Sequence, residues 1–281
     1  MKIREFRKSL KEKQADIALL FSTDSMSYNQ NLFYFTNYKG FGCLAVPTKM
    51  PPFLLVPKME IERARDGLKV TKQLKRIFAL EKKKFLESVD EILRRRRIRM
   101  KKIGIDKSSM SINEFSNFKK FFPKKNFFDI SELSKELRTT KTMREIDFLK
   151  KACNYGDSVI KNALSNFKEF RTESDVSSYL EYQTKKYGLE LSFPPIVASG
   201  NNSAIPHYEP KNSKLKKGFC VIDFGVKYKG YCSDMTRTVF IGKPTRKEKE
   251  VYSFLLKVQN NIISEAEENK SCAELYGSAL K

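Results

Sequence analysis

The stretch Cys220–Ile241 limits the possible folds of this chain more than any other, because it places two strand-like segments close together. Val221–Val226 and Tyr231–Val239 are rich in β-branched and aromatic residues, a composition that favours strands. Between them lies Lys229-Gly230, which contains the glycine that tight turns prefer. The sequence therefore predicts an antiparallel hairpin.

Each predicted strand carries one aspartate, a residue that strand interiors disfavour. A two-residue loop at Tyr228-Lys229 would place Asp223 directly opposite Asp234, with the two Cβ atoms roughly 5 Å apart. Like charges so placed destabilise a strand pair unless a cation compensates them, as a metal ion or a carboxylate-bridged pair of ions would. Two other arrangements stay open. Both carboxylates could lie on a solvated face, or a bulge at Gly230 could shift the register by one residue and separate them.

The net charge of +22, from 55 Lys and Arg against 33 Asp and Glu, raises the question of an acidic partner such as nucleic acid. The lysines are spread over the whole chain, and the residue mixture is rich in Lys and Phe with no Trp. A genome-wide bias of composition explains this charge at least as well as a nucleic-acid function. Nucleic acid is therefore not an expected partner, although composition alone leaves it open.

The five cysteines form no C-x-x-C pair and are odd in number, which indicates neither a disulfide framework nor a zinc knuckle. We expect most of them to be small core residues in a reducing cytosol. The N-terminal residues are followed by no apolar segment of the kind that a secretory signal needs. No apolar run of roughly 18 residues occurs either. These features predict a cytoplasmic protein without a membrane span.

Strand-like and helix-like segments alternate in the first half of the chain, which is typical of an α/β domain. Residues 1–13 have apolar side chains at helical spacing, and Asn31–Tyr38 is an aromatic segment that we expect to be partly extended. The other predicted strands are Ala15–Ser22, Phe41–Pro47, Pro52–Pro57, Lys102–Ile105 and Asn126–Ile130, and the other predicted helices are Lys58–Asp66, Lys83–Arg97, Asn113–Phe121 and Ser131–Leu137.

The run Arg94–Lys102 is the strongest basic cluster of the sequence. One interpretation is a phosphate-binding patch. The other is the C-terminal turn of a helix, where cations interact favourably with the helix dipole and the last carbonyl groups. No aromatic residue lies within the run to stack on nucleic-acid bases, so we favour the helix terminus.

Residues 138–144 are charged and lack apolar periodicity, which predicts a domain boundary. Beyond it, an apolar stripe from Ile146 to Leu164 predicts one helix, and Thr172–Asp175 resembles the capping box of a second. Lys247–Glu268 predicts a long helix with its apolar residues facing inward.

His207 is the only histidine in the chain and lies in a proline-bounded loop before the hairpin. A lone histidine is more often a structural residue than a catalytic one. Near a metal site, however, a neutral imidazole could bind a substrate or move a proton.

Two segments, Leu191–Pro210 and Gly218–Gly242, closely resemble the Xaa-Pro aminopeptidase and prolidase branch of the pita-bread metallopeptidases. The shared features are a proline-rich strand, an A-S-G turn, the P-H-Y triplet, the D-F-G strand and the run G-Y-x-S-D-x-T-R-T. The resemblance extends more weakly to the N-terminal part. It implies a creatinase/prolidase-like α/β N-terminal domain over residues 1–137. It also implies the first half of an α+β pita-bread catalytic domain over residues 138–281.

Members of this family use two divalent ions, commonly Mn²⁺, Co²⁺ or Zn²⁺, held by five protein ligands. By match to the motif, Asp223 and Asp234 would be the first two metal ligands. His207 would contact the substrate and help to stabilise the tetrahedral intermediate, and Thr236 and Arg237 would orient the carboxylates. The implied reaction is attack of a metal-bridging hydroxide on the peptide bond that precedes proline in an Xaa-Pro peptide.

The other ligands of the family, a histidine and two glutamates, belong to a second half of the catalytic domain, and no histidine follows His207. We therefore expect activity to need a missing C-terminal half. Three interpretations follow: a split enzyme completed by a separate chain, a non-catalytic relative acting as a basic protein- or nucleic-acid-binding module, or a truncated gene product. Retention of Asp223, Asp234 and His207 favours the first and the third. Because similar enzymes are usually dimers, a homodimer is a further expectation.

Overall fold

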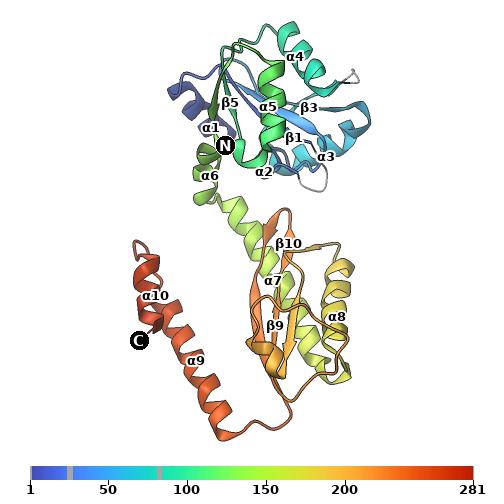
Figure 1. Cartoon of the computed structure of the whole chain (residues 1–281), viewed down its shortest axis with the longest axis vertical. Coiled ribbons are helices and arrows are strands. Elements are labelled where there is room, and N and C mark those ends of the chain that lie inside the picture. The colour runs from blue at the N-terminus through green and yellow to red at the C-terminus, as the bar shows by residue number, and fades with distance from the viewer. Residues whose placement is uncertain (1, 24–27, 81–83, 281) are drawn as a thin grey trace. The chain divides into compact units, whose positions relative to one another are not determined.

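The computed structural model describes residues 2–23, 28–80 and 84–280. The chain divides into two compact units, residues 1–146 and 147–281. Each unit has its own sheet structure (Figure 1). The N-terminal unit contains two hydrophobic clusters and the C-terminal unit contains one. None of the described helices is both long enough and apolar enough to span a bilayer.

The N-terminal unit is built on a six-stranded sheet in the order β4-β3-β2-β1-β5-β6. The pairs β1/β2 and β2/β3 are antiparallel, whereas β3/β4, β1/β5 and β5/β6 are parallel. The strands are β1 Ile17–Ser22, β2 Gly42–Pro47, β3 Phe53–Pro57, β4 Arg76–Leu80, β5 Lys102–Ile105 and β6 Asn126–Asp129. Of these strands, only β4 was absent from the sequence prediction. The observed strands and helices confirm the predicted α/β unit.

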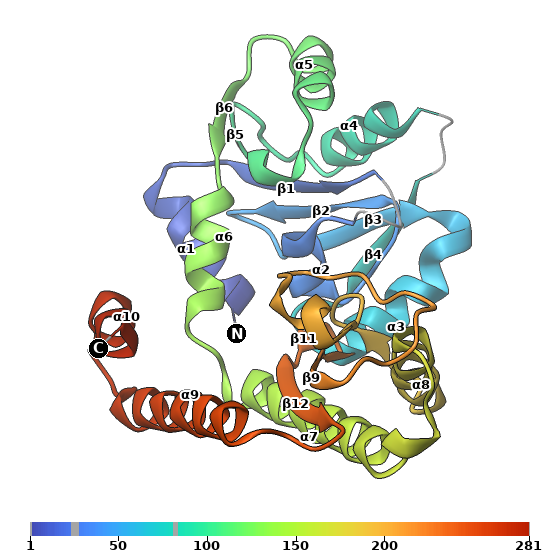
Figure 2. The ribbon, with the colours of Figure 1, turned by 60° about the horizontal axis from the view of Figure 1, so that its bottom comes forward.

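Helices cover both faces of this sheet (Figure 2). Because successive side chains of a strand point to opposite faces, Ala18 and Leu20 join one core while Ile17 and Leu19 join the other. The first core lies under α1 (Lys2–Glu12), α2 (Gln30–Thr36), α3 (Ile61–Thr71) and α6 (Ser131–Thr139), and the second under α4 (Phe85–Arg95) and α5 (Ile112–Phe121).

The prediction that Asn31–Tyr38 is partly extended is wrong, because residues 30–36 form the helix α2. The Asn29 side chain caps this helix by accepting a hydrogen bond from the Leu32 amide N–H at 2.8 Å. Leu32 and Phe35, three positions apart, are both fully buried. Burial of one helical face thus outweighs the modest helix propensity of an aromatic segment.

The C-terminal unit contains two three-stranded sheets, β12-β9-β8 and β11-β10-β7. Their strands are β7 Glu190–Leu191, β8 Ile196–Ser199, β9 Gly218–Phe224, β10 Val226–Tyr228, β11 Tyr231–Cys232 and β12 Met235–Ile241. The helices α7 (Met143–Ser165) and α8 (Glu173–Lys186) pack against them through a core that includes Val159, Leu180 and Ile222. The predicted capping box at the start of α8 is confirmed.

The prediction that the apolar residues of the last long helix face inward is wrong. The helices α9 (Arg246–Glu265) and α10 (Cys272–Leu280) contain no buried residue. On α9, Phe254, Leu255 and Ile263 are 62%, 59% and 66% exposed. The apolar period is present, but the described parts of the chain leave Val258 and Ile262 only half-buried and the other apolar residues of this face exposed.

Leu20→Ala should lower the stability of the N-terminal unit by about 2–5 kcal/mol, because a fully buried leucine in β1 would leave a cavity. Met59→Ala is the matched control, since that side chain is 91% exposed, and it should change the stability by less than about 0.5 kcal/mol. Urea unfolding followed by circular dichroism measures both effects. Similar losses in the two variants would contradict the assigned core.

Candidate active site

A two-residue turn sets the register of the predicted hairpin. Tyr228 pairs with Tyr231, so Lys229 and Gly230 form the turn, with φ angles of 51° and 87°. Positive φ at both central positions is the geometry of a type I′ turn, which matches the twist of paired strands. The predicted loop at Tyr228-Lys229 is therefore wrong by one residue. The physical reason is that the second turn position favours glycine.

This turn changes the partner of the first aspartate. Asp223 pairs with Thr236 rather than with Asp234. Asp234 directly precedes β12. Its exposed side chain and that of Thr236 alternate with the buried Ser233 and the half-buried Met235, which places Asp234 on the same side as Thr236 and diagonal to Asp223. The predicted direct opposition is wrong, but both carboxylates share one face. Asp223 is half-buried and Asp234 is exposed.

A close backbone contact lies beside Asp234. The Ser233 amide N–H donates to the Val226 carbonyl oxygen at 2.9 Å, and the Val226 amide N–H donates to Ser233 Oγ at 3.0 Å. A Cβ atom at Gly225 would lie 2.0 Å from the Ser233 carbonyl oxygen. Only glycine therefore fits at this position, and the contact fixes the backbone next to Asp234.

Thr236 and Arg237 make different contacts. The Thr236 hydroxyl donates to Asp223 Oδ1 at 3.0 Å, so it orients this carboxylate as the resemblance implies. The Arg237 guanidinium lies 3.6 Å from the Asp157 carboxylate on α7 and donates to the Thr236 carbonyl oxygen at 2.9 Å. The resemblance implies that Arg237 orients Asp223 and Asp234. The described contacts of Arg237 include neither aspartate.

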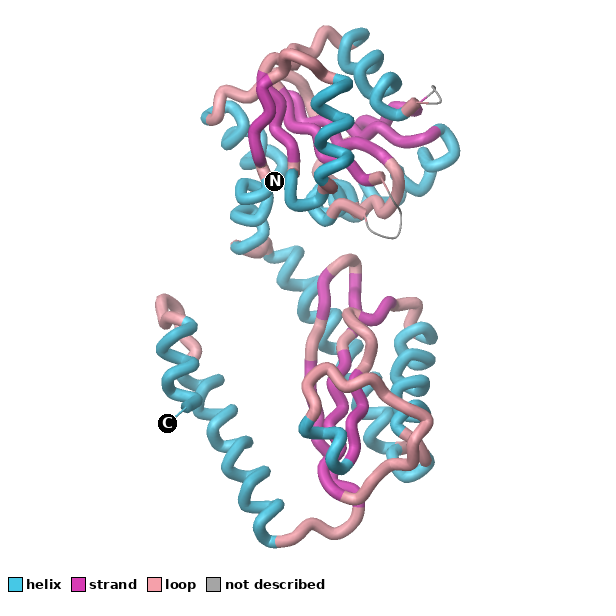
Figure 3. Tube along the Cα trace, in the orientation of Figure 1, coloured by secondary structure: helices cyan, strands magenta, loops and turns pink. Residues whose placement is uncertain are grey.

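His207 lies in the long loop between β8 and β9, after the short helix η4 (Gly200–Ala204). Figure 3 shows the long loops of the C-terminal unit in pink. Its φ of 53° is in the left-handed region, which few non-glycine residues adopt. The His207 side chain is exposed, whereas the adjacent Tyr208 is buried. The loop therefore presents the imidazole to solvent on a backbone that neighbouring contacts must hold in place.

Glu173, the first residue of α8, is a candidate that the sequence pattern does not reveal. Its side chain is fully buried. Oε1 accepts hydrogen bonds from the Ser199 amide N–H, the Ser199 hydroxyl and Asn202 Nδ2, each at 2.9 Å. Oε2 accepts from the Tyr208 hydroxyl at 2.9 Å and the Ser213 hydroxyl at 3.1 Å. Burial by itself raises the pKa of this carboxyl group, but the hydrogen bonds outweigh it and lower the pKa to about 2.

The two aspartates fit a divalent metal ion in their chemistry, because hard carboxylate oxygens suit ions such as Mn²⁺. Among the residues that the structure describes, no three His, Cys, Asp or Glu side chains gather closely enough to hold a metal ion. A metal centre that used Asp223 and Asp234 would therefore need further ligands from outside the described residues.

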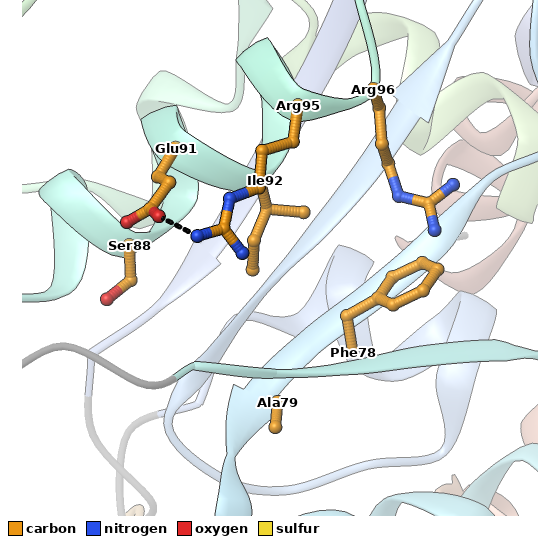
Figure 4. A pocket seen from close by; sticks show the side chains of 7 residues that line it. All are labelled: Phe78, Ala79, Ser88, Glu91, Ile92, Arg95 and Arg96. Atoms are coloured by element: carbon orange, nitrogen blue, oxygen red, sulfur yellow. Dashed lines mark ion pairs between the residues drawn. The ribbon is translucent and has the colours of Figure 1, made fainter.

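The prediction that the basic run Arg94–Lys102 begins in the last turn of a helix is confirmed, since α4 ends at Arg95. Arg94 and Arg95 form ion pairs with acidic residues one turn earlier, at 2.7 and 2.5 Å. Arg96 lies over the Phe78 ring, 3.7 Å from its centroid. Arg95, Arg96 and Phe78 line a cavity of about 360 Å³ (Figure 4). Because both arginines already have partners, these contacts give the phosphate-binding interpretation no support.

The prediction that most cysteines are core residues is wrong. Cys43 and Cys220 are buried, but Cys153, Cys232 and Cys272 are exposed. Three of these residues are thus thiols at the surface of their units. Burial raises the pKa of the Cys220 thiol to about 12, which keeps this group protonated.

Both units match known protein families. Residues 2–140 match the creatinase/prolidase N-terminal domain, and residues 147–281 match metallopeptidase family M24. Each match falls within one of the two compact units. The same two domains are the ones that the sequence motifs imply.

Individual relatives agree with these families. An uncharacterized peptidase of Staphylococcus saprophyticus is 32% identical over 271 residues, which cover 94% of this chain and 73% of the relative. A Xaa-Pro dipeptidase of Pyrococcus furiosus is 32% identical over 249 residues, which cover 87% and 68%. The solved X-Pro aminopeptidase of Thermotoga maritima has a TM-score of 0.84 at 26% identity, covering 97% of this chain and 76% of that one. The solved prolidase of Pyrococcus furiosus has a TM-score of 0.78 at 30% identity, with the same two coverages of 97% and 76%.

Gly225→Ala should destabilise the C-terminal unit by about 1–3 kcal/mol or more, because the added methyl group meets the Ser233 backbone. Gly277→Ala is the matched control. A Cβ atom there meets nothing within 4 Å, and alanine in α10 should be neutral or stabilising by up to about 1 kcal/mol. Thermal unfolding measures both variants. Equal stability of Gly225→Ala and the unmodified chain would contradict the backbone contact.

Glu173 should make the stability of the C-terminal unit depend on pH. Its pKa of about 2 in the folded state lies below the ordinary value of 4.5, so it stabilises the fold above about pH 4.5. This contribution, about 3 kcal/mol, is lost as the pH falls towards 2. Glu173→Gln cannot ionise. Its stability deficit relative to the unmodified chain should therefore shrink between about pH 6 and about pH 3 in thermal melts, and a constant deficit would contradict the depressed pKa.

Proposed function

Because this chain belongs to metallopeptidase family M24 and carries the N-terminal domain of creatinases and prolidases, we propose that it takes part in the hydrolysis of Xaa-Pro peptides. The bond cleaved is the peptide bond that precedes proline, in a reaction of the prolidase or aminopeptidase P type. Asp223 and Asp234 act as metal ligands, and His207 contacts the substrate. The relatives named as Xaa-Pro dipeptidase and X-Pro aminopeptidase support this substrate class.

The observation that carries the proposal is the placement of Asp223 on β9 and of Asp234 directly before β12, on the same side of this strand pair. The Thr236 hydroxyl orients the first carboxylate, and the Gly225–Ser233 contact fixes the backbone beside the second. A strand pair that needed only a core would have no reason to hold two acidic side chains near each other on one face.

The chemistry of the two ligands favours Mn²⁺, with Co²⁺ and Zn²⁺ as alternatives. When bound, divalent ions would supply a Lewis acid for the scissile carbonyl and lower the pKa of a bound water molecule. The chain's own residues have separate tasks. Asp223 and Asp234 hold the ions, Thr236 keeps Asp223 in one orientation, and the exposed imidazole of His207 donates a hydrogen bond to the substrate.

The proposal includes the remaining half of the catalytic domain, which supplies a histidine and two glutamates to complete the metal centre, and a separate polypeptide is one source of that half. In the described ranges, the two aspartates have no third ligand beside them. The exposed apolar residues of α9, such as Phe254 and Leu255, offer a surface on which such a polypeptide could pack. A homodimer is the alternative assembly. Comparing the activity of the chain alone with that of its mixture with the completing polypeptide distinguishes the two assemblies.

A second candidate function is a basic module that binds acidic proteins or nucleic acid, and the net charge of +22 is the observation that favours it. This function predicts an affinity for nucleic acid that falls steeply with salt, because binding would release counterions. The two aspartates of the β9/β12 pair have no task in such a module, so the peptidase remains the better-supported function.

Hydrolysis of Ala-Pro and of a longer Xaa-Pro peptide should appear when the chain, Mn²⁺ and a polypeptide with the missing ligands are mixed. The chain alone should show little or no activity. Asp223→Asn and Asp234→Asn should each reduce activity by more than the roughly 10–100-fold that loss of an outer hydrogen-bond partner costs. Substitution by asparagine keeps the size of each side chain and removes the charge that the ion needs.

Asp66→Asn is the control variant, because its side chain in the N-terminal unit is 74% exposed. This variant should keep full activity in the mixture. Mn²⁺ affinity measured by calorimetry provides a readout that does not depend on turnover. If the mixture is inactive, and if neither aspartate variant changes Mn²⁺ affinity, the peptidase proposal is wrong.

A further inference from the structure

One buried carboxylate connects the two ends of the loop that carries His207. Glu173 accepts hydrogen bonds from Ser199 and Asn202 at the start of this loop and from Tyr208 and Ser213 towards its end. The five hydrogen bonds, including two from Ser199, are all between 2.9 and 3.1 Å long. Two of these hydrogen bonds come from Ser199, the last residue of β8, and the other three come from the segment between β8 and β9, so the carboxylate ties this segment to the end of a strand.

The main chain adds to this connection. The Glu173 amide N–H donates to the Ser213 carbonyl oxygen at 3.2 Å, and the Ser174 amide N–H donates to the Lys211 carbonyl oxygen at 3.1 Å. Asn202 Nδ2 also donates to the Tyr208 hydroxyl at 2.9 Å, which joins the two ends of the loop directly. The first turn of α8 is therefore the anchor of the loop on both sides of His207.

The charge of Glu173 is held by hydrogen bonds rather than by a cation. In the part of the chain that the structure describes, Glu173 forms no ion pair with a lysine or arginine, although it is fully buried. Its position in the first turn of a helix favours a negative charge, because the amide groups there carry partial positive charge. Charge-assisted hydrogen bonds are about twice as strong as neutral ones, so an anion at this position stiffens every partner it contacts.

His207 depends on this anchor because it has little else to hold it. Its side chain is exposed and makes no hydrogen bond to a described residue. Its backbone adopts φ of 53°, a conformation that persists only where the surrounding structure imposes it. The next residue, Tyr208, is buried and donates its hydroxyl to Glu173. The path from the carboxylate to the imidazole therefore spans one side chain and one peptide unit.

We propose that Glu173 is a positioning residue for the Xaa-Pro peptidase site, because it holds the His207 loop in the one conformation that presents the imidazole. The catalytic role of this positioning rests on the proposed function. Glu173 itself does not touch substrate and acts only through Tyr208, Asn202 and the two serines. A merely structural Glu173 would stabilise the core of the unit without determining where the imidazole points.

The lone histidine makes the proposal directly measurable. Because the chain has one histidine, its Hε1–Cε1 cross-peak in an NMR spectrum reports only His207. In Glu173→Gln, at a temperature where circular dichroism shows a folded protein, this peak should shift and broaden at least about twofold as the loop samples several conformations. Glu181→Gln is the matched control on the exposed side of α8 and should leave the peak unchanged.

A His207 peak with the same position and width in folded Glu173→Gln as in the unmodified chain would overturn the proposal. If Glu173→Gln does not fold, Tyr208→Phe decides the question, because it removes one hydroxyl from the network and keeps the ring in place. Displacement and broadening of the His207 peak in Tyr208→Phe support the proposal, and an unchanged peak refutes it.

A second arm separates this inference from the proposed function. Added Mn²⁺ should broaden the His207 peak of the unmodified chain if the metal binds near the loop, and Asp223→Asn should abolish that broadening. Absence of the Asp223-dependent broadening would count against the metal site. The comparison of Glu173→Gln with the unmodified chain is made without metal, so it would still decide whether Glu173 positions the imidazole.

Discussion

The Lys229-Gly230 turn is the constraint on which the candidate site depends, because it decides which residues of the two strands face each other. From the Tyr228–Tyr231 pair at its base, the same register extends to the pairing of Asp223 with Thr236. A slip of one residue would move Asp234 to the face that packs on the core. The close contact between Gly225 and Ser233 opposes such a slip. Only glycine fits against the Ser233 backbone, and a slip would bring a residue with a side chain to that place.

The imidazole of His207 and the two carboxylates are positioned by different kinds of interaction. Backbone pairing positions Asp223 and Asp234, which lie on or beside regular strands. His207 lies in an irregular loop, where side-chain hydrogen bonds must replace the backbone ladder. Glu173 provides them from the start of α8. The sheet and the neighbouring helix thus contribute separately to one site, and the loss of either would displace only part of it.

The sequence predicts the strands, the two aspartates on one face and the histidine loop, but not the register. A shift by two residues leaves every side chain on the same face, so the alternation of polar and apolar residues cannot distinguish Thr236 from Asp234 as the partner of Asp223. Only the positive φ angles that the turn requires, which place Gly230 at its second position, identify Thr236 as the partner of Asp223. Glu173 escapes prediction because its partners lie 26 to 40 residues away, and a first-turn acid has a sufficient local explanation. The apolar face of α9 is visible in the sequence, whereas its exposure depends on what packs against it.

The most direct test of the account is a crystal of the chain grown with Mn²⁺ and measured at the manganese absorption edge. The account predicts an anomalous-scattering peak in contact with carboxylate oxygens of both Asp223 and Asp234, at roughly 2.0–2.6 Å as in other hard-ion sites. A peak bound to one aspartate and absent from Asp223→Asn crystals would support the same centre with a single ion. Manganese bound only elsewhere, with both carboxylates free of it, would contradict the claim that these aspartates form the metal-binding half of a peptidase site.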